Sequence, residues 1–299
     1  MPLKYFICQD NEQIAIDKCL QKKGCRLKDR CATLPYLRMI GYDREWRGIT
    51  PSMAGTGPRQ IYLKATTDYA VSPNSRAFSA LGVAVHNKLS IHKYSHNVLS
   101  EETLSDDESK GIADLLEEDE NKEGYFILED YKSAGSYNVA QWLGIVKEKE
   151  LIPILDEEGN PVLLKSGPNM GKPKTRTETT FIIDPDKIQM ENEELQINRY
   201  RLFYESYGFP VSKMYISSIV RDGGIMVASS RGITQNIYKI PVKRLDDEYV
   251  LETYRTLKKE VEEGFGAGFC RMCTTSETWD GRRCEKYCEV NEACKEMGE

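Results

Sequence analysis

The sequence predicts a mixed α/β protein in which helices flank a mixed sheet and a cysteine-rich segment lies at each end. Segments of alternating hydrophobicity and segments of helical period occur together in the central region, without repeated strand–helix–strand units. Apolar residues form 40% of the 299 positions, which is enough for a packed core. Four of the nine cysteines lie within the first 31 residues and five within the last 30.

Composition excludes several classes of protein. No uninterrupted apolar stretch approaches the roughly 20 residues that span a bilayer. The first residues lack the charged segment and long apolar run of a secretory signal. We therefore expect a cytoplasmic protein without a membrane partner, in which a disulfide framework is disfavoured and thiolate metal sites are possible.

A helix is predicted to begin at Ser72, as N-cap, with Pro73 in the first helical position. The apolar positions that follow share one helical face: Phe78, Leu81, Val85 and Leu89. His86 lies on a neighbouring flank, one turn after Gly82.

Strand patterns follow this helix. Three of them, separated by acidic or glycine-containing turns, predict an antiparallel meander: 96–104, 111–116 and 125–132. Two more, 144–155 and 179–184, predict a hairpin around a basic loop at 160–176, which has four cations and no acid. The remaining expected elements are a helix at 185–207, strands at 214–220 and 235–242, and a helix at 245–263.

Clusters of glycine and proline, together with the distribution of the cysteines, divide the chain into three parts. We expect a cysteine-rich module at 1–50, a core at 51–265 with an insertion at about 143–183, and a cysteine-rich tail at 266–299. Charge is uneven, because residues 1–65 carry 12 Lys and Arg against 6 Asp and Glu, whereas residues 101–158 carry 5 against 18. The basic first part is suited to contact phosphates, and the acidic block is suited to divalent cations.

The stretch 111–132 carries the strongest chemical signal. The period of two places Asp130 and Lys132 on one face of a strand, with Glu129 and Tyr131 on the other. Asp114 lies sixteen residues before Asp130, a separation that fits two adjacent strands joined by an acidic turn. If these strands pair in that register, both aspartates and the lysine meet at one site.

Two neighbouring carboxylates repel each other, and a divalent cation relieves the repulsion by taking both as ligands. Such an ion polarises a phosphoryl oxygen and activates water, while an ammonium group stabilises developing charge. This combination suits phosphodiester hydrolysis. Taken alone, the same triplet also fits an ordinary salt bridge between Asp130 and Lys132 on a solvated sheet.

Five short motifs in order make the region from about 51 to 220 resemble the RecB-like branch of the PD-(D/E)XK nuclease superfamily. The motifs are S-x(4)-C-P-R-x-x-Y, G-x-x-x-H, G-x-x-D, D-Y-K and Q-x-x-x-Y. The matching residues are Ser52, Gly57, Pro58, Arg59 and Tyr62; Gly82 and His86; Gly111 and Asp114; Asp130, Tyr131 and Lys132; and Gln196 and Tyr200.

The resemblance implies a restriction-endonuclease-like core and a Mg²⁺ or Mn²⁺ site. In such sites the ligands correspond to His86, Asp114, Asp130 and the backbone carbonyl of Tyr131. Lys132 would position the attacking water. Gln196, Tyr200 and Arg59 would contact DNA. Outside this family context, His86 reads as an ordinary helix histidine and Gln196 and Tyr200 as a helix surface.

The resemblance also concerns the cysteines of the tail. Iron–sulfur members of the family take one ligand from the C-P-R motif, where this chain has Gly57, and three from the closing cysteines. The latter resemble Cys284, Cys288 and Cys294, so Cys270 or Cys273 is expected to replace the missing ligand. The C-x₂-C spacing of Cys270 and Cys273 equally suits zinc, and both metals remain open for four of these five cysteines.

The four N-terminal cysteines have spacings that fit no standard zinc ribbon. They are Cys8, Cys19, Cys25 and Cys31. We favour structural zinc here over free thiols, because short cysteine-rich segments cannot build an apolar core of their own.

The sequence thus predicts a metal-dependent deoxyribonuclease, of the exonuclease or single-strand-directed kind, that acts on single strands or ends in recombination, repair or mobile-element DNA processing. The alternative is a catalytically inactive nuclease-fold module that binds DNA or protein. A zinc-ribbon-type regulator is a third interpretation, but the cysteine-rich parts make up barely a quarter of the chain.

Overall fold

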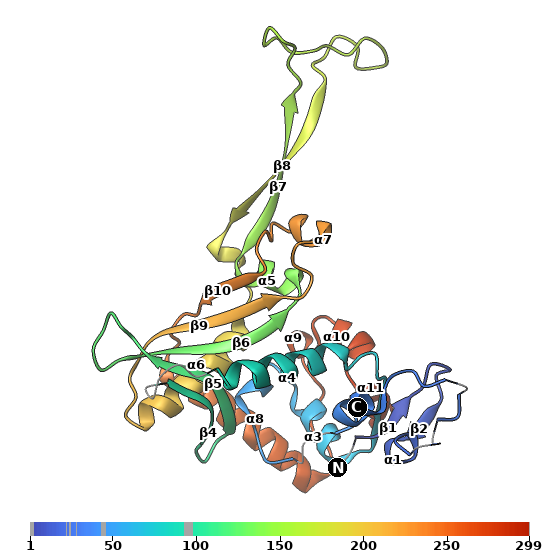
Figure 1. Cartoon of the computed structure of the whole chain (residues 1–299), viewed down its shortest axis with the longest axis vertical. Coiled ribbons are helices and arrows are strands. Elements are labelled where there is room, and N and C mark those ends of the chain that lie inside the picture. The colour runs from blue at the N-terminus through green and yellow to red at the C-terminus, as the bar shows by residue number, and fades with distance from the viewer. Residues whose placement is uncertain are drawn as a thin grey trace. The chain divides into compact units, whose positions relative to one another are not determined.

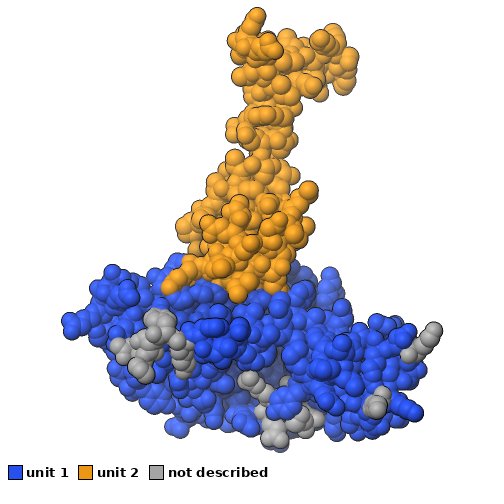
Figure 2. Space-filling view, in the orientation of Figure 1, with its two compact units in different colours: residues 1–133, 191–217, 241–299 blue, residues 134–190, 218–240 orange. Residues whose placement is uncertain are grey.

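The computed structural model describes residues 3–21, 23, 25–27, 29–42, 46–92 and 98–298. It divides into two compact units (Figure 2). The first comprises residues 1–133, 191–217 and 241–299, and the second comprises residues 134–190 and 218–240. Within the described ranges, no helix is long and apolar enough to cross a membrane.

The largest sheet has five strands in the order β10-β9-β6-β5-β4 (Figure 1). These are β4 (Val98–Ser105), β5 (Lys110–Glu118), β6 (Phe126–Ala134), β9 (Val211–Val220) and β10 (Ile237–Pro241). β4 pairs with β5, and β5 with β6, both antiparallel. The predicted meander is therefore confirmed, and the chain is a mixed α/β protein.

Four helices of the first unit complete this region: α3 (Pro58–Thr66), α4 (Ala77–Ser90), α6 (Glu191–Ser206) and α8 (Asp247–Ala267). α8 is capped by the Asp246 carboxylate, which accepts from the Tyr249 N–H, and ends at Gly268 in a left-handed conformation. Its apolar stripe packs on α3 and α6. The shared core consists of Ile49, Ala54, Ile61, Leu195, Val250, Tyr254, Leu257 and Val261.

The two cysteine-rich ends of the chain share a second core. The N-terminal part contains β1 (Leu3–Ile7), β2 (Gln13–Ala15), α1 (Ile16–Cys19) and α2 (Leu34–Ile40), and β1 pairs in parallel with β3 (Tyr69–Val71). The tail contains α9 (Thr275–Thr278), α10 (Arg282–Lys286) and α11 (Asn291–Met297). Cys270 and Val290 of the tail pack with Phe6, Leu37 and Leu63. The N-terminal part, the tail and α3 thus share one hydrophobic core.

The second unit contains a two-stranded ribbon, visible in Figure 1 as the long hairpin beyond α5 and α7. α5 (Ser136–Trp142) precedes β7 (Ile145–Pro153), which pairs antiparallel with β8 (Thr175–Ile183), and α7 (Met226–Ser229) follows later. The predicted hairpin is confirmed. Its basic loop forms the exposed tip.

Two helix boundaries differ from the prediction. α4 begins at Ala77, because Ser72 to Ser75 close a turn in which the Ser75 N–H donates to the Ser72 carbonyl at 3.1 Å. The apolar stripe of α4 is also exposed: Phe78 is 59% accessible. α6 begins at Glu191, because Pro185–Lys187 form a separate 3-10 turn that Asp184 caps.

Candidate active site

Asp114 lies at the centre of a polar cluster in the first unit. One carboxylate oxygen, Oδ1, is 3.0 Å from His86 Nδ1 of α4. The other, Oδ2, accepts from the Tyr131 backbone N–H of β6 at 2.7 Å. Asp114 is 7% exposed, so both oxygens are held in a largely dry environment. A helix and two strands therefore meet at one side chain.

Asp130, Lys132 and Gln196 form the second half of the cluster. Asp130 Oδ2 lies 2.7 Å from Lys132 Nζ. The Gln196 side chain of α6 donates to Asp130 Oδ1 at 3.1 Å and accepts from Lys132 Nζ at 2.9 Å. The alternation predicted for β6 is confirmed, since Glu129 instead accepts from the Ser217 hydroxyl. Gln196 thus holds the acid and the ammonium in fixed positions.

The two aspartates approach each other as the strand spacing predicts. The register that pairs Leu115 with Glu129 places Asp114 opposite Asp130 when it is continued by one residue. Burial raises the pKa of Asp130, Lys132 opposes this shift, and Asp114 adds to it. Burial alone would lower the pKa of Lys132, but Asp130 outweighs burial and leaves that pKa raised. Lys132 therefore carries its charge at neutral pH.

Among the described residues, an ion pair is the only polar contact of one carboxylate oxygen in this cluster. Asp130 is 4% exposed, and its Oδ2 makes no hydrogen bond of acceptable geometry although Lys132 Nζ is 2.7 Å away. We regard this contact as an ion pair that leaves acceptor capacity on Oδ2. A buried carboxylate oxygen that retains a lone pair is costly without a further partner, and a cation satisfies it. The donor set consequently suits a hard divalent metal ion.

Glu101 lies next to this cluster, although it is part of none of the sequence motifs. One ligand atom each from His86, Glu101 and Asp114 lies within 4.8 Å of the others. The pairs that flank Glu101 and Asp114 in β4 and β5 share one register, which makes these two acids cross-strand neighbours. The sequence gives no sign of this role, because Glu101 is one of several polar residues in a strand. Its backbone also has a left-handed φ of 56°, which a sequence pattern does not predict for glutamate.

His86 is held by these acids. Its hydrogen bond to Asp114 raises the imidazole pKa, burial opposes the shift, and the charges of Asp114, Asp130 and Glu101 add to it. The ring also meets Tyr131 edge to face, with centroids 6.1 Å apart. His86 is therefore part of the acidic cluster.

Tyr200 lies beneath the cluster and is closed to solvent. It is 5% exposed, and burial raises the pKa of its hydroxyl far above the usual range. A Cβ on Gly111 would lie 2.8 Å from Tyr200 Cε1 and 2.7 Å from Pro51 Cδ. Gly111 is therefore required for the close packing of β5 against this ring.

Glu193, in the first turn of α6, lies within electrostatic range of Lys132 and Asp130.

Arg59 does not join this site. It is 2% exposed, and its guanidinium donates to the backbone carbonyls of Cys270 at 3.4 Å and Cys294 at 3.2 Å. The Arg59 guanidinium is therefore bound to the tail, and its expected contact with DNA stays a prediction. The sequence around Arg59 could not indicate these partners, because the tail lies more than 200 residues further along the chain.

None of the nine cysteines forms a disulfide. At the N-terminal end, Cys19 is buried within electrostatic range of the other three: Cys8, Cys25 and Cys31. In the tail, Cys273 lies in such range of Cys284 and Cys294, and Cys288 does as well. Electrostatic interactions therefore connect the four N-terminal cysteines with one another and four of the five tail cysteines with one another, and metal binding at either end stays a prediction.

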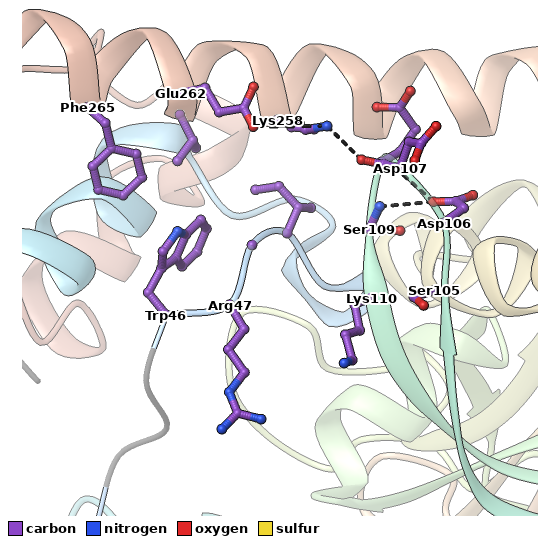
Figure 3. A pocket seen from close by; sticks show the side chains of 14 residues that line it. Trp46, Arg47, Ser105, Asp106, Asp107, Ser109, Lys110, Lys258, Glu262 and Phe265 are labelled. Atoms are coloured by element: carbon purple, nitrogen blue, oxygen red, sulfur yellow. Dashed lines mark hydrogen bonds and ion pairs between the residues drawn. The ribbon is translucent and has the colours of Figure 1, made fainter.

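A separate pocket lies elsewhere on the first unit (Figure 3). It has a volume of about 350 Å³ and is lined by residues 46–49, the β4–β5 turn and α8. Trp46 and Phe265 face each other there, with ring centroids 5.8 Å apart. None of the candidate metal ligands lines it.

Comparisons with known proteins supply no assignment. The scan against protein-family models and the search of curated proteins both find no match.

Proposed function

We propose that the chain is a metal-dependent nuclease that hydrolyses DNA at the cluster formed by His86, Glu101, Asp114, Asp130 and Lys132. The observation that carries this proposal is the buried carboxylate of Asp130, whose Oδ2 forms an ion pair with Lys132, beside a second buried aspartate. The ordered motifs that resemble RecB-like nucleases lend it further support.

The acidic side of the cluster would bind the metal. His86, Glu101, Asp114 and Asp130 offer one nitrogen and several carboxylate oxygens, a set suited to Mg²⁺ or Mn²⁺. When bound, the ion would polarise the scissile phosphate and lower the pKa of a coordinated water. The Tyr131 N–H fixes the orientation of Asp114 through Oδ2, and this leaves Oδ1 directed at His86.

Lys132 supplies the positive charge on the opposite side. Its ammonium is oriented by Asp130 and Gln196 together, so it is preorganised and loses little entropy when it acts. A fixed ammonium stabilises the negative charge that develops on the phosphoryl oxygens during attack by water. Gln196 is a positioning residue, because it contacts Lys132 and Asp130.

The rival function is a nuclease-fold module that binds DNA without cleaving it. Loss of one catalytic side chain would favour that rival. In this chain the histidine, both aspartates and the lysine are present and in mutual contact or electrostatic range. We therefore favour hydrolysis, on single strands or DNA ends, over binding alone.

The experiment compares linear double-stranded and single-stranded DNA, with RNA in parallel, in the presence of Mg²⁺, Mn²⁺ or EDTA. Wild-type protein should cleave DNA only with metal. Asp130→Ala and Lys132→Ala should each remove cleavage, and the double variant Asp130→Asn/Lys132→Met avoids leaving one buried charge unpaired. Circular dichroism and thermal melting establish that each variant is folded.

The matched control is Lys213→Ala. Lys213 Nζ pairs with Asp119 Oδ2 at 3.1 Å on the same sheet, so it reports the effect of losing an ion pair outside the site. Cleavage should persist in this variant. Undiminished cleavage by the folded Asp130 and Lys132 variants would refute the proposal, and metal-independent DNA binding without cleavage would favour the rival.

A further inference from the structure

We infer that the pocket of Figure 3 binds one unpaired base of a DNA single strand, which stacks against Trp46 while Arg47 and Lys110 contact the neighbouring phosphates. The inference rests on the proposed nuclease function, because it names the form of the substrate and a second contact of the strand away from the metal cluster. Every residue that lines the pocket belongs to the first unit.

An aromatic wall forms one side of the pocket. The rings of Trp46 and Phe265 are tilted by 51° with centroids 5.8 Å apart, and Phe265 meets Tyr62 edge to face at 5.6 Å. Tyr62 is anchored in turn, since its hydroxyl donates to the Gly268 carbonyl at 2.7 Å. These contacts still leave Trp46 36% and Phe265 40% exposed. The wall is therefore held in place before a ligand arrives.

The floor of the pocket is apolar. Ile49 and Val261 line it and are 2% and 0% exposed, so they belong to the core beneath. The volume of about 350 Å³ falls near the lower end of the range of small-molecule sites. An aromatic wall above an apolar floor suits a planar ring, and every nucleobase offers such a ring.

Two exposed cations, Arg47 and Lys110, also line the pocket. No dashed line reaches either side chain in Figure 3, so neither pairs with another residue drawn there. The Lys110 N–H donates to the Ile49 carbonyl at 2.9 Å. This bond ties Lys110 to the segment that carries Trp46 and Arg47, and it keeps the two cations near the aromatic wall.

Most acids of the pocket already have partners. Three of the four that line it each pair with a cation: Asp106 with Arg199, Glu108 with Arg255, and Glu262 with Lys258. Asp106 is held most firmly, because both its oxygens accept from the Arg199 guanidinium, which is 1% exposed. Asp107 remains, against two cations. The pocket therefore offers net positive charge, which suits the phosphates on either side of a base.

The pocket and the metal cluster lie along the same two strands. The β4–β5 register pairs Ser105 with Lys110 at the pocket and brings Glu101 opposite Asp114 in the cluster. Four positions separate the two sites on each strand, which corresponds to about 13 Å at about 3.3 Å per residue. Stacked nucleotides rise about 3.4 Å each, so roughly four of them cover that distance. One strand is therefore long enough to contact both sites at once.

The contact requires an unpaired base. In a duplex each base is paired and stacked between its neighbours, and its removal from the stack costs free energy. A single strand or a frayed end presents its bases without that cost. The pocket therefore favours single strands over intact duplex.

The test measures binding by fluorescence anisotropy in EDTA, so that no strand is cleaved. The probe is a labelled oligothymidylate of about 12 nucleotides. Trp46→Ala should weaken its binding by about 5- to 150-fold, the loss that one base–aromatic stack produces. Trp46→Phe, which keeps a ring, should recover most of the affinity. The matched control is Tyr249→Ala, which removes a 56% exposed ring of α8 outside the pocket and should bind as wild type does.

A strand of abasic sites separates stacking from charge. It keeps the phosphates but has no bases, so Trp46→Ala should leave its affinity unchanged. Arg47→Gln/Lys110→Gln should reduce the salt slope of both strands by about 0.7 for each phosphate that is no longer contacted. Blunt duplex, whose bases are paired, should bind Trp46→Ala as it binds wild type.

A second readout uses the native ring. Oligothymidylate should quench the tryptophan fluorescence of wild-type protein, and Trp46→Phe should lack this quenching. Equal affinity of wild type and folded Trp46→Ala for oligothymidylate would overturn the inference. An equal loss of affinity on the abasic strand or the duplex would also overturn it, because the ring would then have only a structural role.

Cleavage is measured separately, which distinguishes this inference from the nuclease proposal. Absence of metal-dependent cleavage would refute the nuclease proposal, whereas an affinity in EDTA that depends on Trp46 and on the presence of bases would still support the base-binding pocket. Cleavage without any effect of Trp46→Ala on affinity would refute the pocket alone.

Discussion

Glu101 lies directly across from Asp114 in the antiparallel pairing of β4 and β5, between the registered pairs Ser100–Leu115 and Glu102–Ala113. Like charges in this position repel each other across the sheet. His86 Nδ1 is 3.0 Å from Asp114 and 3.8 Å from Glu101, so the ring relieves part of the repulsion when it is protonated. The left-handed φ of Glu101 costs additional conformational energy. Such a costly arrangement is typical of a ligand site.

Glu101→Gln should therefore have opposite effects on stability and on metal binding. Without metal, the variant should unfold at a higher urea concentration, by the equivalent of about 0.2–1 kcal/mol, because a repulsive cross-strand pair is removed. Its affinity for Mn²⁺, measured by titration calorimetry, should fall at least about tenfold.

Glu102→Gln is the control for this pair of effects. Glu102 is the adjacent residue, and its charge acts on Tyr204 rather than on His86. Manganese affinity should be unchanged in that variant. Equal Mn²⁺ affinity of wild type and Glu101→Gln would remove Glu101 from the ligand set.

Gln196→Leu should lower the rate of cleavage without weakening DNA binding. The amide bridges Asp130 Oδ1 and Lys132 Nζ, so its loss frees the ammonium to leave its position. Misplacement of a catalytic group costs up to about 100-fold in rate. Single-turnover kinetics and fluorescence anisotropy separate the two effects. Gln189→Leu, which removes an amide bonded to Gln141 at 2.6 Å, should leave both unchanged.

Asp119 should make stability depend on acidic pH. A hydrogen bond from the Ser212 hydroxyl at 2.7 Å, with help from Lys213 and the Asn121 N–H, lowers the pKa of Asp119 from 3.8 to about 2. Because the folded-state pKa is the lower one, the carboxylate stabilises the fold above the unfolded value of 3.8, and this contribution disappears as pH falls toward 2.

The measurement is the urea midpoint of wild type and Asp119→Asn as a function of pH. Wild type should be the more stable protein at about pH 6, and the difference should shrink to near zero at about pH 2. Glu263→Gln, which removes an exposed partner of Lys259, should show no such trend. A difference that is constant with pH would contradict the assignment.

The tip of the β7–β8 ribbon should contribute to DNA affinity by charge alone. Lys165, Lys172 and Lys174 are exposed in a loop without acidic residues from 160 to 176. Replacing all three by glutamine should weaken binding and reduce the slope of log affinity against log salt by about 0.9 for each phosphate that the tip neutralises. Glu148→Gln/Glu150→Gln on the same ribbon is the control, and it should not weaken binding. An unchanged salt slope in the lysine variant would exclude the tip from the interface.

Local patterns in the sequence were sufficient for much of the sheet and for part of the site. Alternating residues located the strands that became β4, β5 and β6, and the same period placed Asp130 and Lys132 on one face. Helix boundaries were less accurate. Ser72–Ser75 form a turn and Pro185–Lys187 form a 3-10 turn, although both segments were predicted to start helices, because local hydrogen bonds compete with helix formation.

What the sequence determined by itself was the identity of chemical groups and their spacing along the chain: the alternation in β6, the helical interval from Gln196 to Tyr200 and the clustering of cysteines at the ends. Only the tertiary structure decided which distant groups meet. It brought Glu101 opposite Asp114, buried Arg59 beneath the tail, and placed the thiol of Cys273 where Gly57 leaves room. Residues close in sequence are constrained by backbone geometry, whereas contacts between distant segments depend on strand register and packing, which no local pattern encodes.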